Sequence, residues 1–279
     1  MQVVKQLADV RKLRAGRAGT WGVVPTMGFL HAGHLSLVDR ARIENDQVGV
    51  SIFVNPTQFG PTEDLAAYPR DLDRDLELLQ QAGADVVWVP DEGEVYPPDF
   101  QTYVVVEGVT KPLEGAARPG HFRGVATVVA KLFNVFLPHR AYFGQKDAQQ
   151  AVVIRQMARD LNFPVDLVIC PTVREPDGLA MSSRNVYLTP EQRAAAPVLY
   201  RALSAARSVW VNGERDGEHL RQAMRRVLDA EPLAQTEYLS AANPLTLEEL
   251  GLASTGALLS MAVRIGRARL IDNLLLEDE

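Results

Sequence analysis

The sequence predicts an α/β protein: a Rossmann-like parallel sheet in the N-terminal part and a smaller α+β domain in the C-terminal part. Strand-like apolar runs alternate with helical patterns from Trp21 to Cys170, which indicates βαβ units. From Glu191 onward, helical spacing rich in Ala, Arg and Leu precedes short strand candidates, a pattern typical of a separate α+β domain. We place the Rossmann-like domain at residues 1–174 and the smaller domain at residues 175–279.

The N-terminal elements follow from apolar spacing and from Gly and Pro. Helical spacing predicts a helix near residues 3–14. Pro25 is expected to end the first strand, because proline has no N–H to donate to a ladder. Strands are predicted over 21–24, 47–54, 85–90, 103–107, 141–143 and 165–170, and loops over 61–70 and 91–99. Helices are predicted from 72, from 125 and from 148, and an earlier helix is predicted to have His34 in its first turn.

The C-terminal elements begin with a helix signal at Thr189-Pro190-Glu191-Gln192, with Thr as N-cap, Pro at the first helical position and Gln completing a capping box. Helical spacing then continues to about residue 230 and is broken at Asn212-Gly213. Short strands are predicted over 236–240, 258–263 and 269–271, and the acidic tail 277–279 is expected to fray.

Composition narrows the class of protein. The chain has 279 residues, 47% hydrophobic and 23% charged, with a formal charge of −6, which argues against a nucleic-acid partner. We find no apolar run long enough to span a bilayer and no signal peptide. The one cysteine, Cys170, fits a reducing compartment, so we expect a cytoplasmic protein, and its place at the end of an apolar run predicts a buried thiol rather than a nucleophile.

The sequence Pro25-Thr26-Met27-Gly28-Phe29-Leu30-His31-Ala32-Gly33-His34 joins a strand to an amphipathic helix. Gly28 and Gly33 permit a tight turn, and the N-terminus of the helix offers backbone N–H groups to an anion. Two imidazoles three residues apart add donors for phosphate oxygens. A metal site or a simple surface cap is the alternative, but the flanking glycines and the preceding strand favour a nucleotide phosphate site.

Four later segments carry polar groups at strand ends or helix starts. Asn55 and Gln58 follow a strand, where ligands collect in parallel sheets, although they could also satisfy local backbone groups. His121 and Arg123 open a helix, where they either contact an anion or belong to a solvated loop. The glycine turn Gly144-Gln145-Lys146-Asp147 precedes a helix, so Lys146 suits phosphate chemistry or is a plain surface lysine. The hydroxyls and guanidinium of Ser182-Ser183-Arg184 form a compact donor set on a turn that can close over a ligand.

Taken together, these motifs resemble the pantothenate synthetase (pantoate–β-alanine ligase) family of the nucleotidylyltransferase superfamily. The His turn resembles the HIGH-type motif of that superfamily, and Met181-Ser182-Ser183-Arg184 resembles its KMSKS-type loop. The narrower resemblance is carried by the following segments: Phe53-Val54-Asn55-Pro56-Thr57-Gln58-Phe59, Arg118-Pro119-Gly120-His121-Phe122-Arg123-Gly124, Phe143-Gly144-Gln145-Lys146-Asp147 and Ser182-Ser183-Arg184-Asn185. The match runs in order along essentially the whole chain.

The resemblance implies an ATP-dependent ligase that joins pantoate to β-alanine through a pantoyl adenylate and releases AMP and diphosphate. It also implies Mg²⁺ bound with ATP and a homodimer. Asp73 and Asp75 are the candidate carboxylate ligands for Mg²⁺. The implied ATP contacts are Met27, Gly28, Phe29, Leu30, His31, Ala32, Gly33, His34, Gly144, Gln145, Lys146, Asp147, Val173, Met181, Ser182, Ser183 and Arg184.

By the same match, His34 takes the catalytic role, and Gln58 and Gln150 bind pantoate, with Gln58 also near β-alanine. Donors at His31, His34, Lys146, Ser182, Ser183 and Arg184 fit the charge that develops on phosphate oxygens, and Asn55 suits a small polar acid. The rival interpretations are a nucleotidylyltransferase with a phosphate-bearing acceptor, a relative of aminoacyl-tRNA synthetases, and a nucleotide-binding regulatory module.

Overall fold

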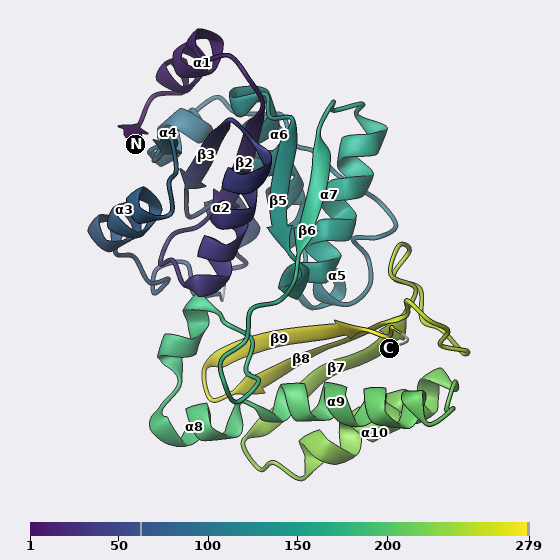
Figure 1. The fold of residues 1–279 in the computed structure, drawn as a ribbon. Helices are drawn as coiled ribbons and strands as arrows, with labels where there is room; N and C mark the ends of the chain where they lie inside the picture. The colour runs from purple at the N-terminus through teal and green to yellow at the C-terminus, as the bar shows by residue number, and fades with distance from the viewer. Residues whose placement is uncertain (62, 278–279) are drawn as a thin grey trace. The chain divides into compact units, whose positions relative to one another are not determined.

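Within the residues that the structure describes, 1–61 and 63–277, a parallel sheet of six strands forms the centre of the first of two units (Figure 1). The computed structural model orders these strands β1-β4-β3-β2-β5-β6, and each pairing is parallel. The order reverses between β2 and β5, so the switch point of the sheet lies at their carboxyl ends. The strands are β1 (Gln2–Val4), β2 (Trp21–Thr26), β3 (Gln47–Ile52), β4 (Val86–Trp88), β5 (Arg140–Gly144) and β6 (Asp166–Cys170). The predicted Rossmann-like sheet is confirmed.

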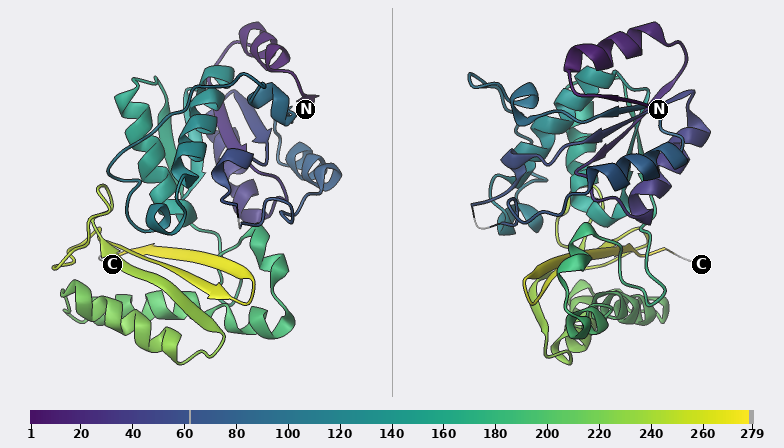
Figure 2. Two further views of the ribbon diagram at one scale, coloured as in Figure 1. Left: turned by 180° about the vertical axis from the view of Figure 1, so that it is seen from behind. Right: turned by 90° about the vertical axis from the view of Figure 1, so that its left-hand side faces the viewer.

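Helices cover both faces of this sheet (Figure 2). On one face, Val38 of α2 and Leu79 of α3 share a buried core with Val50 and Val87 of the strands. On the other face, α6 approaches β3 so closely that a Cβ at Gly49 would lie 2.5 Å from the ring of Phe136. The helices are α1 (Leu7–Gly16), α2 (Ala32–Glu44), α3 (Leu72–Gln81), α4 (Glu92–Val95), α6 (His121–Phe136) and α7 (Ala148–Asp160), with 3-10 helices η1 (Pro56–Gln58) and η2 (Gln145–Asp147).

The described part of the second unit is built on an antiparallel sheet of three strands in the order β7-β8-β9. Two long helices, α9 and α10, bury one face of that sheet, with Trp210 and Leu220 among the residues of the shared core. Its elements are η3 (Ser183–Tyr187), α8 (Pro190–Ala195), α9 (Val198–Val211), α10 (Gly217–Asp229), β7 (Ala234–Ala242), β8 (Leu258–Ile265) and β9 (Ala268–Leu275). The predicted smaller α+β domain is confirmed, including the capping box at Thr189 and Gln192.

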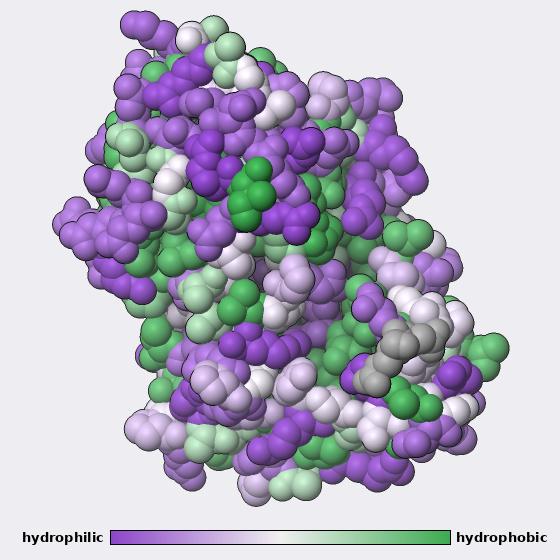
Figure 3. All heavy atoms as spheres, in the orientation of Figure 1, coloured by the Kyte–Doolittle hydropathy of each residue, from purple (hydrophilic) through white to green (hydrophobic). Residues whose placement is uncertain are grey.

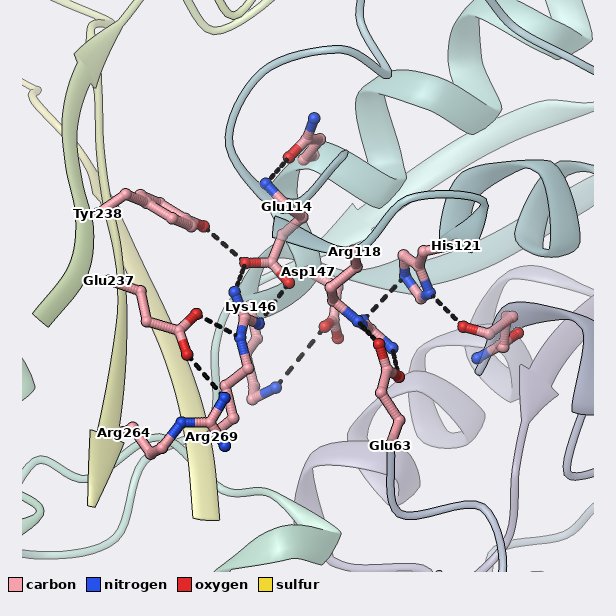
Figure 4. Close-up of polar contacts among 12 residues, drawn as sticks. Glu63, Glu114, Arg118, His121, Lys146, Asp147, Glu237, Tyr238, Arg264 and Arg269 are labelled. Carbon is pink, nitrogen blue, oxygen red and sulfur yellow. Dashed lines mark hydrogen bonds and ion pairs between the residues drawn. The ribbon is translucent and has the colours of Figure 1, made fainter. Parts of the chain in front are cut away.

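Two short excursions of the chain also belong to the second unit. The first, Gly108–Ala117, includes helix α5 (Glu114–Ala117). Its Glu114 carboxylate accepts hydrogen bonds from the Arg269 guanidinium at 2.6 and 2.7 Å and from the Tyr238 hydroxyl at 2.9 Å (Figure 4). The second excursion, Lys146–Val152, packs Ala148 and Val152 with residues of the same unit. Apart from these excursions the second unit begins at Thr172, and the predicted domain division after residue 174 stays a prediction.

Strand β2 includes Pro25, which we expected to end it. The reason is local. Thr26 O accepts from Phe53 N, so the backbone polar groups of Thr26 point toward β3, and the backbone nitrogen of Pro25 points toward β5. Pairing with β5 extends only from Gly22 to Val23, so no ladder bond is lost where proline lacks its N–H. Proline therefore ends the pairing on one side but not the strand.

Three further predictions about the N-terminal elements are wrong. Val3 belongs to β1, which pairs with β4, and the helix begins only at Leu7. The segment 103–107 forms no strand: Val104 N donates to the Thr127 hydroxyl at 3.0 Å instead of to a ladder, and Val105 is 63% exposed. The predicted loop 91–99 contains the short helix α4. Residues 278 and 279 of the expected frayed tail lie outside the described residues.

The surface carries interspersed hydrophilic and hydrophobic residues on the face drawn in Figure 3. In the described ranges, the helices are all too short or too polar to cross a membrane. Cys170 is buried, as the sequence predicts, and burial raises the pKa of its thiol above the ordinary value.

Candidate active site

The turn between β2 and α2 has the backbone geometry that the glycine pattern predicts. Gly28 has a φ of +82°, and a Cβ there would lie 3.0 Å from Asp75 Oδ2 and 3.1 Å from Ile52 Cγ2. Phe29 follows in the left-handed region at φ +50°, an uncommon conformation for a residue with a side chain. The turn therefore requires glycine at 28, and residue 29 needs a stabilising contact from another part of the protein.

The contact that stabilises residue 29 comes from the first turn of α3. The buried carboxylate of Asp75 accepts hydrogen bonds from Phe29 N and Leu30 N, each at 2.7 Å. Arg74 donates to Leu30 O at 3.0 Å, so adjacent residues of α3 bind both the donors and the acceptor of this turn. Burial raises the pKa of Asp75, and the two backbone hydrogen bonds act in the opposite direction without outweighing it.

The two histidines cap the N-terminus of α2. His31 is the N-cap, and its Nδ1 accepts from Gly33 N at 3.1 Å, while His34 Nδ1 accepts from His31 N at 3.3 Å. Because each Nδ1 accepts, the proton of each neutral ring is on Nε2, and each ring is a donor at that atom. The ring centroids lie 4.0 Å apart. The predicted place of His34 in the first helical turn is confirmed, and the arrangement suits an anion at a helix N-terminus.

Asn55 and Gln58 form a buried amide cluster next to this turn. Asn55 Nδ2 donates to Gln58 Oε1 at 3.0 Å and to Gly124 O at 3.1 Å, and Asn55 Oδ1 accepts from the Tyr96 hydroxyl at 2.9 Å. Gln58 Nε2 lies 3.1 Å from Met27 Sδ. The structure thus brings together two of the three residues predicted to bind the substrate acid, Asn55 and Gln58, and a residue of the His turn, Met27.

Helix α6 packs against the same cluster. A Cβ at Gly124 would lie 2.4 Å from Thr57 O, so only glycine allows α6 to approach η1 this closely. Of the two basic residues in the predicted anion loop, His121 is buried with both ring nitrogens bonded inside the protein. Arg123 is exposed, with its guanidinium carbon 3.4 Å from the ring centroid of Tyr103. These contacts favour a structural role for the loop.

The glycine turn after β5 forms η2 and leads into α7. Gly144 ends β5, and Gln145 and Lys146 lie in the 3-10 turn rather than in the α-helix itself. Lys146 Nζ lies 3.6 Å from Asp147 Oδ1, and Lys146 O accepts from Asn273 Nδ2 at 2.8 Å.

Gln150 lies in the first turn of α7 and is half-buried. Its neighbour Gln149 is buried instead: its amide donates to Val109 O and Pro112 O and accepts from Glu114 N. The two adjacent glutamines therefore differ in burial, and Gln149 holds the segment 108–117 against α7.

Val173 and Met181, predicted separately as ATP contacts, lie opposite each other in one hairpin. Met181 N donates to Val173 O at 3.0 Å, and Arg174 and Ala180 form a bridge around the turn at 176–178. Ser182 then caps η3, where its hydroxyl accepts from Arg184 N at 3.3 Å, and Ser183 is buried.

This hairpin is fixed to β9 by an ion pair that the sequence alone does not reveal. Arg174 donates to both carboxylate oxygens of Asp272 at 2.6 and 2.9 Å, and its guanidinium lies 4.2 Å from the ring centroid of Tyr200. Asp272 is almost fully buried, and the next residue, Asn273, is the one that binds Lys146 O. Adjacent residues of β9 therefore hold both the hairpin and the lysine turn.

The candidate residues fall into two sets, one in each unit. The first set lies at the switch point of the parallel sheet: Met27 to His34, Asn55, Gln58, Gly144 and Gln145. The second set lies in the other unit: Lys146, Asp147, Gln150, Val173 and Met181 to Arg184. Sequence reasoning missed the residues that anchor each set, Asp75 in the first and Arg174 with Asp272 in the second. A signal that could have indicated this ion pair is the single carboxylate, Asp272, within a largely apolar strand pattern.

The candidate magnesium ligands do not form a metal centre. Asp75 uses both oxygens for backbone N–H groups, and Asp73 is exposed. In the part of the chain that the structure describes, no group of three His, Cys, Asp or Glu side chains could hold a metal ion.

A Rossmann-like sheet with a histidine-capped helix at its switch point is typical of α/β proteins that bind nucleotides. The family model of pantoate-beta-alanine ligase matches residues 2–275, and the chain belongs to that family.

Individual relatives are similar to this chain along its full length. Pantothenate synthetase from Chloroflexus aggregans is 65% identical over 277 residues, covering 99% of this chain and 100% of the relative. The crystal structure of pantothenate synthetase from Thermus thermophilus is 53% identical, with a TM-score of 0.96 and full coverage of both chains. A pantoate-beta-alanine ligase from Francisella tularensis, crystallised with beta-gamma ATP and beta-alanine, is 34% identical, with a TM-score of 0.82 over 100% of this chain and 99% of that one.

Proposed function

We propose that this protein condenses pantoate with β-alanine at the expense of ATP, by way of a pantoyl adenylate. Membership of the pantoate-beta-alanine ligase family supports the overall reaction. The observation that carries the site assignment is the pair of histidine Nε2 donors at the N-terminus of α2, which follow a turn whose Phe29 and Leu30 N–H groups are bound by the buried carboxylate of Asp75.

In the first step, a carboxylate oxygen of pantoate attacks the α-phosphorus of ATP, and the bond from that phosphorus to the bridging oxygen of diphosphate breaks. Negative charge develops on the phosphate oxygens and on the leaving diphosphate. Preorganised donors are the largest catalytic contribution expected for such a step. We assign that work to His34 and His31 with Lys146, Ser182, Ser183 and Arg184.

In the second step, the neutral amine of β-alanine attacks the acyl carbon, the bond from that carbon to the phosphate oxygen breaks, which releases AMP, and the nitrogen gives up one proton to water. The step requires no protein nucleophile, in keeping with the buried thiol of Cys170. It depends mainly on holding the two reactants together. Asn55, Gln58 and Gln150 are the amides that we assign to the acids, since a polar site left unpaired penalises a wrong substrate.

The remaining ATP contacts are assigned by position in the motifs. Met27, Gly28, Phe29, Leu30, Ala32 and Gly33 supply backbone or packing around the phosphates. Gly144, Gln145, Asp147, Val173 and Met181 are assigned to the rest of the nucleotide.

Because the described residues include no cluster of three metal-binding side chains, we propose that Mg²⁺ would enter with the nucleotide and would take few protein ligands. It would neutralise charge on the phosphates. From the family resemblance we also propose a homodimer, and the single buried thiol of Cys170 fits a reducing compartment such as the cytoplasm.

The test is release of AMP and diphosphate from ATP and Mg²⁺, with both acids and with each alone. We expect sustained AMP release only with both acids, and a fall in turnover of about 100-fold or more in His34→Ala and in Lys146→Ala. His219→Gln, in an exposed histidine of α10, is the control and should keep full turnover. ATP binding without either product would favour a regulatory module, and AMP transfer to a phosphate-bearing acceptor would favour a nucleotidylyltransferase.

A further inference from the structure

We propose that His121 is a positioning residue that orients Gln58 for the substrate acid. This inference rests on the proposed function, because it takes Gln58 as a substrate contact. The motif around His121 was singled out in the sequence as a candidate anion loop, and the proposed reaction leaves it without a role.

The ring of His121 joins two parts of the first unit. His121 Nδ1 lies 2.9 Å from Gln58 O, and His121 Nε2 lies 3.1 Å from Arg118 Nη1. A carbonyl oxygen only accepts and a guanidinium only donates. The ring must therefore donate from Nδ1 and accept at Nε2, which fixes it as the neutral tautomer protonated on Nδ1.

This tautomer is opposite to that of the two histidines at the β2–α2 turn, whose Nδ1 atoms accept. The difference separates their roles. His31 and His34 carry Nε2 donors that suit phosphate oxygens, whereas both nitrogens of His121 are used inside the protein.

Arg118 is itself held by Glu63. Its Nε and Nη2 atoms donate to Glu63 Oε1 at 2.9 Å and to Oε2 at 2.6 Å, a two-pronged ion pair (Figure 4). The pair is largely buried, with side-chain exposures of 16% for Arg118 and 23% for Glu63. A chain of hydrogen bonds thus runs from Glu63 through Arg118 and His121 to the backbone of Gln58.

The backbone of Gln58 is a sensitive place for such a bond. Gln58 ends the single turn η1, and its side chain is already shared between Asn55 and Met27. The carbonyl that His121 binds is attached to the Cα that carries this side chain, so a shift of the backbone at Gln58 would move the side-chain amide relative to both partners. His121 therefore fixes the orientation of the amide that faces the acid without contacting the substrate.

Two isosteric substitutions separate the bonds of the ring. In His121→Asn, the amide nitrogen takes the place of Nδ1 and can still donate to Gln58 O, but the contact with Arg118 is lost. In His121→Gln, the amide oxygen takes the place of Nε2 and can still accept from Arg118, but the bond to Gln58 is lost. Each variant loses one hydrogen bond, so similar losses of stability are expected, and urea unfolding of both checks this.

Steady-state kinetics then show which bond matters. We expect KM for pantoate to rise about 3- to 10-fold in His121→Gln, the equivalent of one hydrogen bond, with KM for ATP unchanged. His121→Asn should stay near the wild-type value. Arg123→Ala, two residues further along α6 and exposed, is the matched control and should leave both KM values unchanged. Equal KM values for pantoate in the two His121 variants, or a rise in KM for ATP instead, would overturn the proposal.

Nitrogen-15 NMR of the His121 ring provides a readout that does not depend on activity. We expect a protonated Nδ1 and an unprotonated Nε2 in the wild-type protein, and the opposite tautomer would overturn the proposal. Absence of pantoate-dependent turnover in the wild-type protein would instead refute the proposed function, so the two failures are distinguishable.

Discussion

Asp75→Asn is the substitution whose effect can be worked out most fully from the structure. The carboxylate accepts two backbone hydrogen bonds, from Phe29 N and Leu30 N, each at 2.7 Å. Asparagine has one carbonyl oxygen, so one bond persists and its NH₂ group faces the other backbone N–H. A lost hydrogen bond to a charged group costs about 1.5–3 kcal/mol, and an unpaired buried donor adds about 1–3 kcal/mol.

Part of that loss is offset, because asparagine removes the cost of burying a charge, the same cost that raises the pKa of Asp75. We therefore expect a net destabilisation of about 2 kcal/mol. The turn also loses the restraint that keeps Phe29 at positive φ, and displacement of reacting groups by about 1 Å can lower the rate about 100-fold. A fall in kcat/KM for ATP of about tenfold or more is expected.

The assay is urea unfolding followed by steady-state AMP release. Asp73→Asn is the control, because Asp73 is exposed in the same turn of α3, and its stability should stay within about 0.5 kcal/mol of wild type. If Asp75→Asn unfolded at the wild-type urea concentration and kept wild-type kcat/KM for ATP, the anchoring role of Asp75 would be refuted.

Three further predictions concern the rest of the molecule. Arg174→Lys replaces a two-pronged contact with Asp272 by a point charge, so the free energy of unfolding should fall by about 1.5–3 kcal/mol. An unchanged free energy of unfolding would contradict the role of this pair. The hydrogen bond to Glu214 raises the pKa of His219 above its ordinary value of 6.5, so this contact stabilises the fold at low pH and ceases to do so as pH rises through the raised pKa. NMR titration should give a lower midpoint for His219 in Glu214→Gln, and an equal midpoint would count against the contact. The Cys170 thiol is buried and its pKa is raised, so a disulfide reagent should modify it only in urea. Cys170→Ala should keep turnover. Fast modification of the native protein would show instead that the thiol is accessible.

The sequence predicts well whatever depends on neighbours along the chain. The turn at Gly28, the place of His34 in the first helical turn and the capping box at Thr189 follow from local hydrogen bonding and backbone sterics, and the structure has them where expected. The alternation of strands and helices likewise predicts a parallel sheet, because a crossover helix between strands leaves them parallel.

The failures arise where tertiary contacts decide. Val3 fits helical spacing but pairs with β4, which lies far along the chain. Val104 fits a strand, yet its N–H binds the Thr127 hydroxyl of α6 instead of a neighbouring strand. Asp75 fits the charged face of an amphipathic helix, and only the fold brings the β2–α2 turn onto its carboxylate. The contacts made by Asp75 and by Arg174 with Asp272 are likewise tertiary, so the sequence does not predict them. Most of the other candidate residues follow from local motifs.

The central claim is that a carboxylate oxygen of pantoate attacks the α-phosphorus of ATP. The most direct measurement uses pantoate labelled with ¹⁸O in the carboxylate, together with β-alanine, ATP and Mg²⁺, and analyses the products by mass spectrometry. We predict one ¹⁸O atom in the phosphate of AMP, since the acyl carbon–oxygen bond breaks in the second step. Label in inorganic phosphate with formation of ADP, or AMP without label, would contradict the adenylate route.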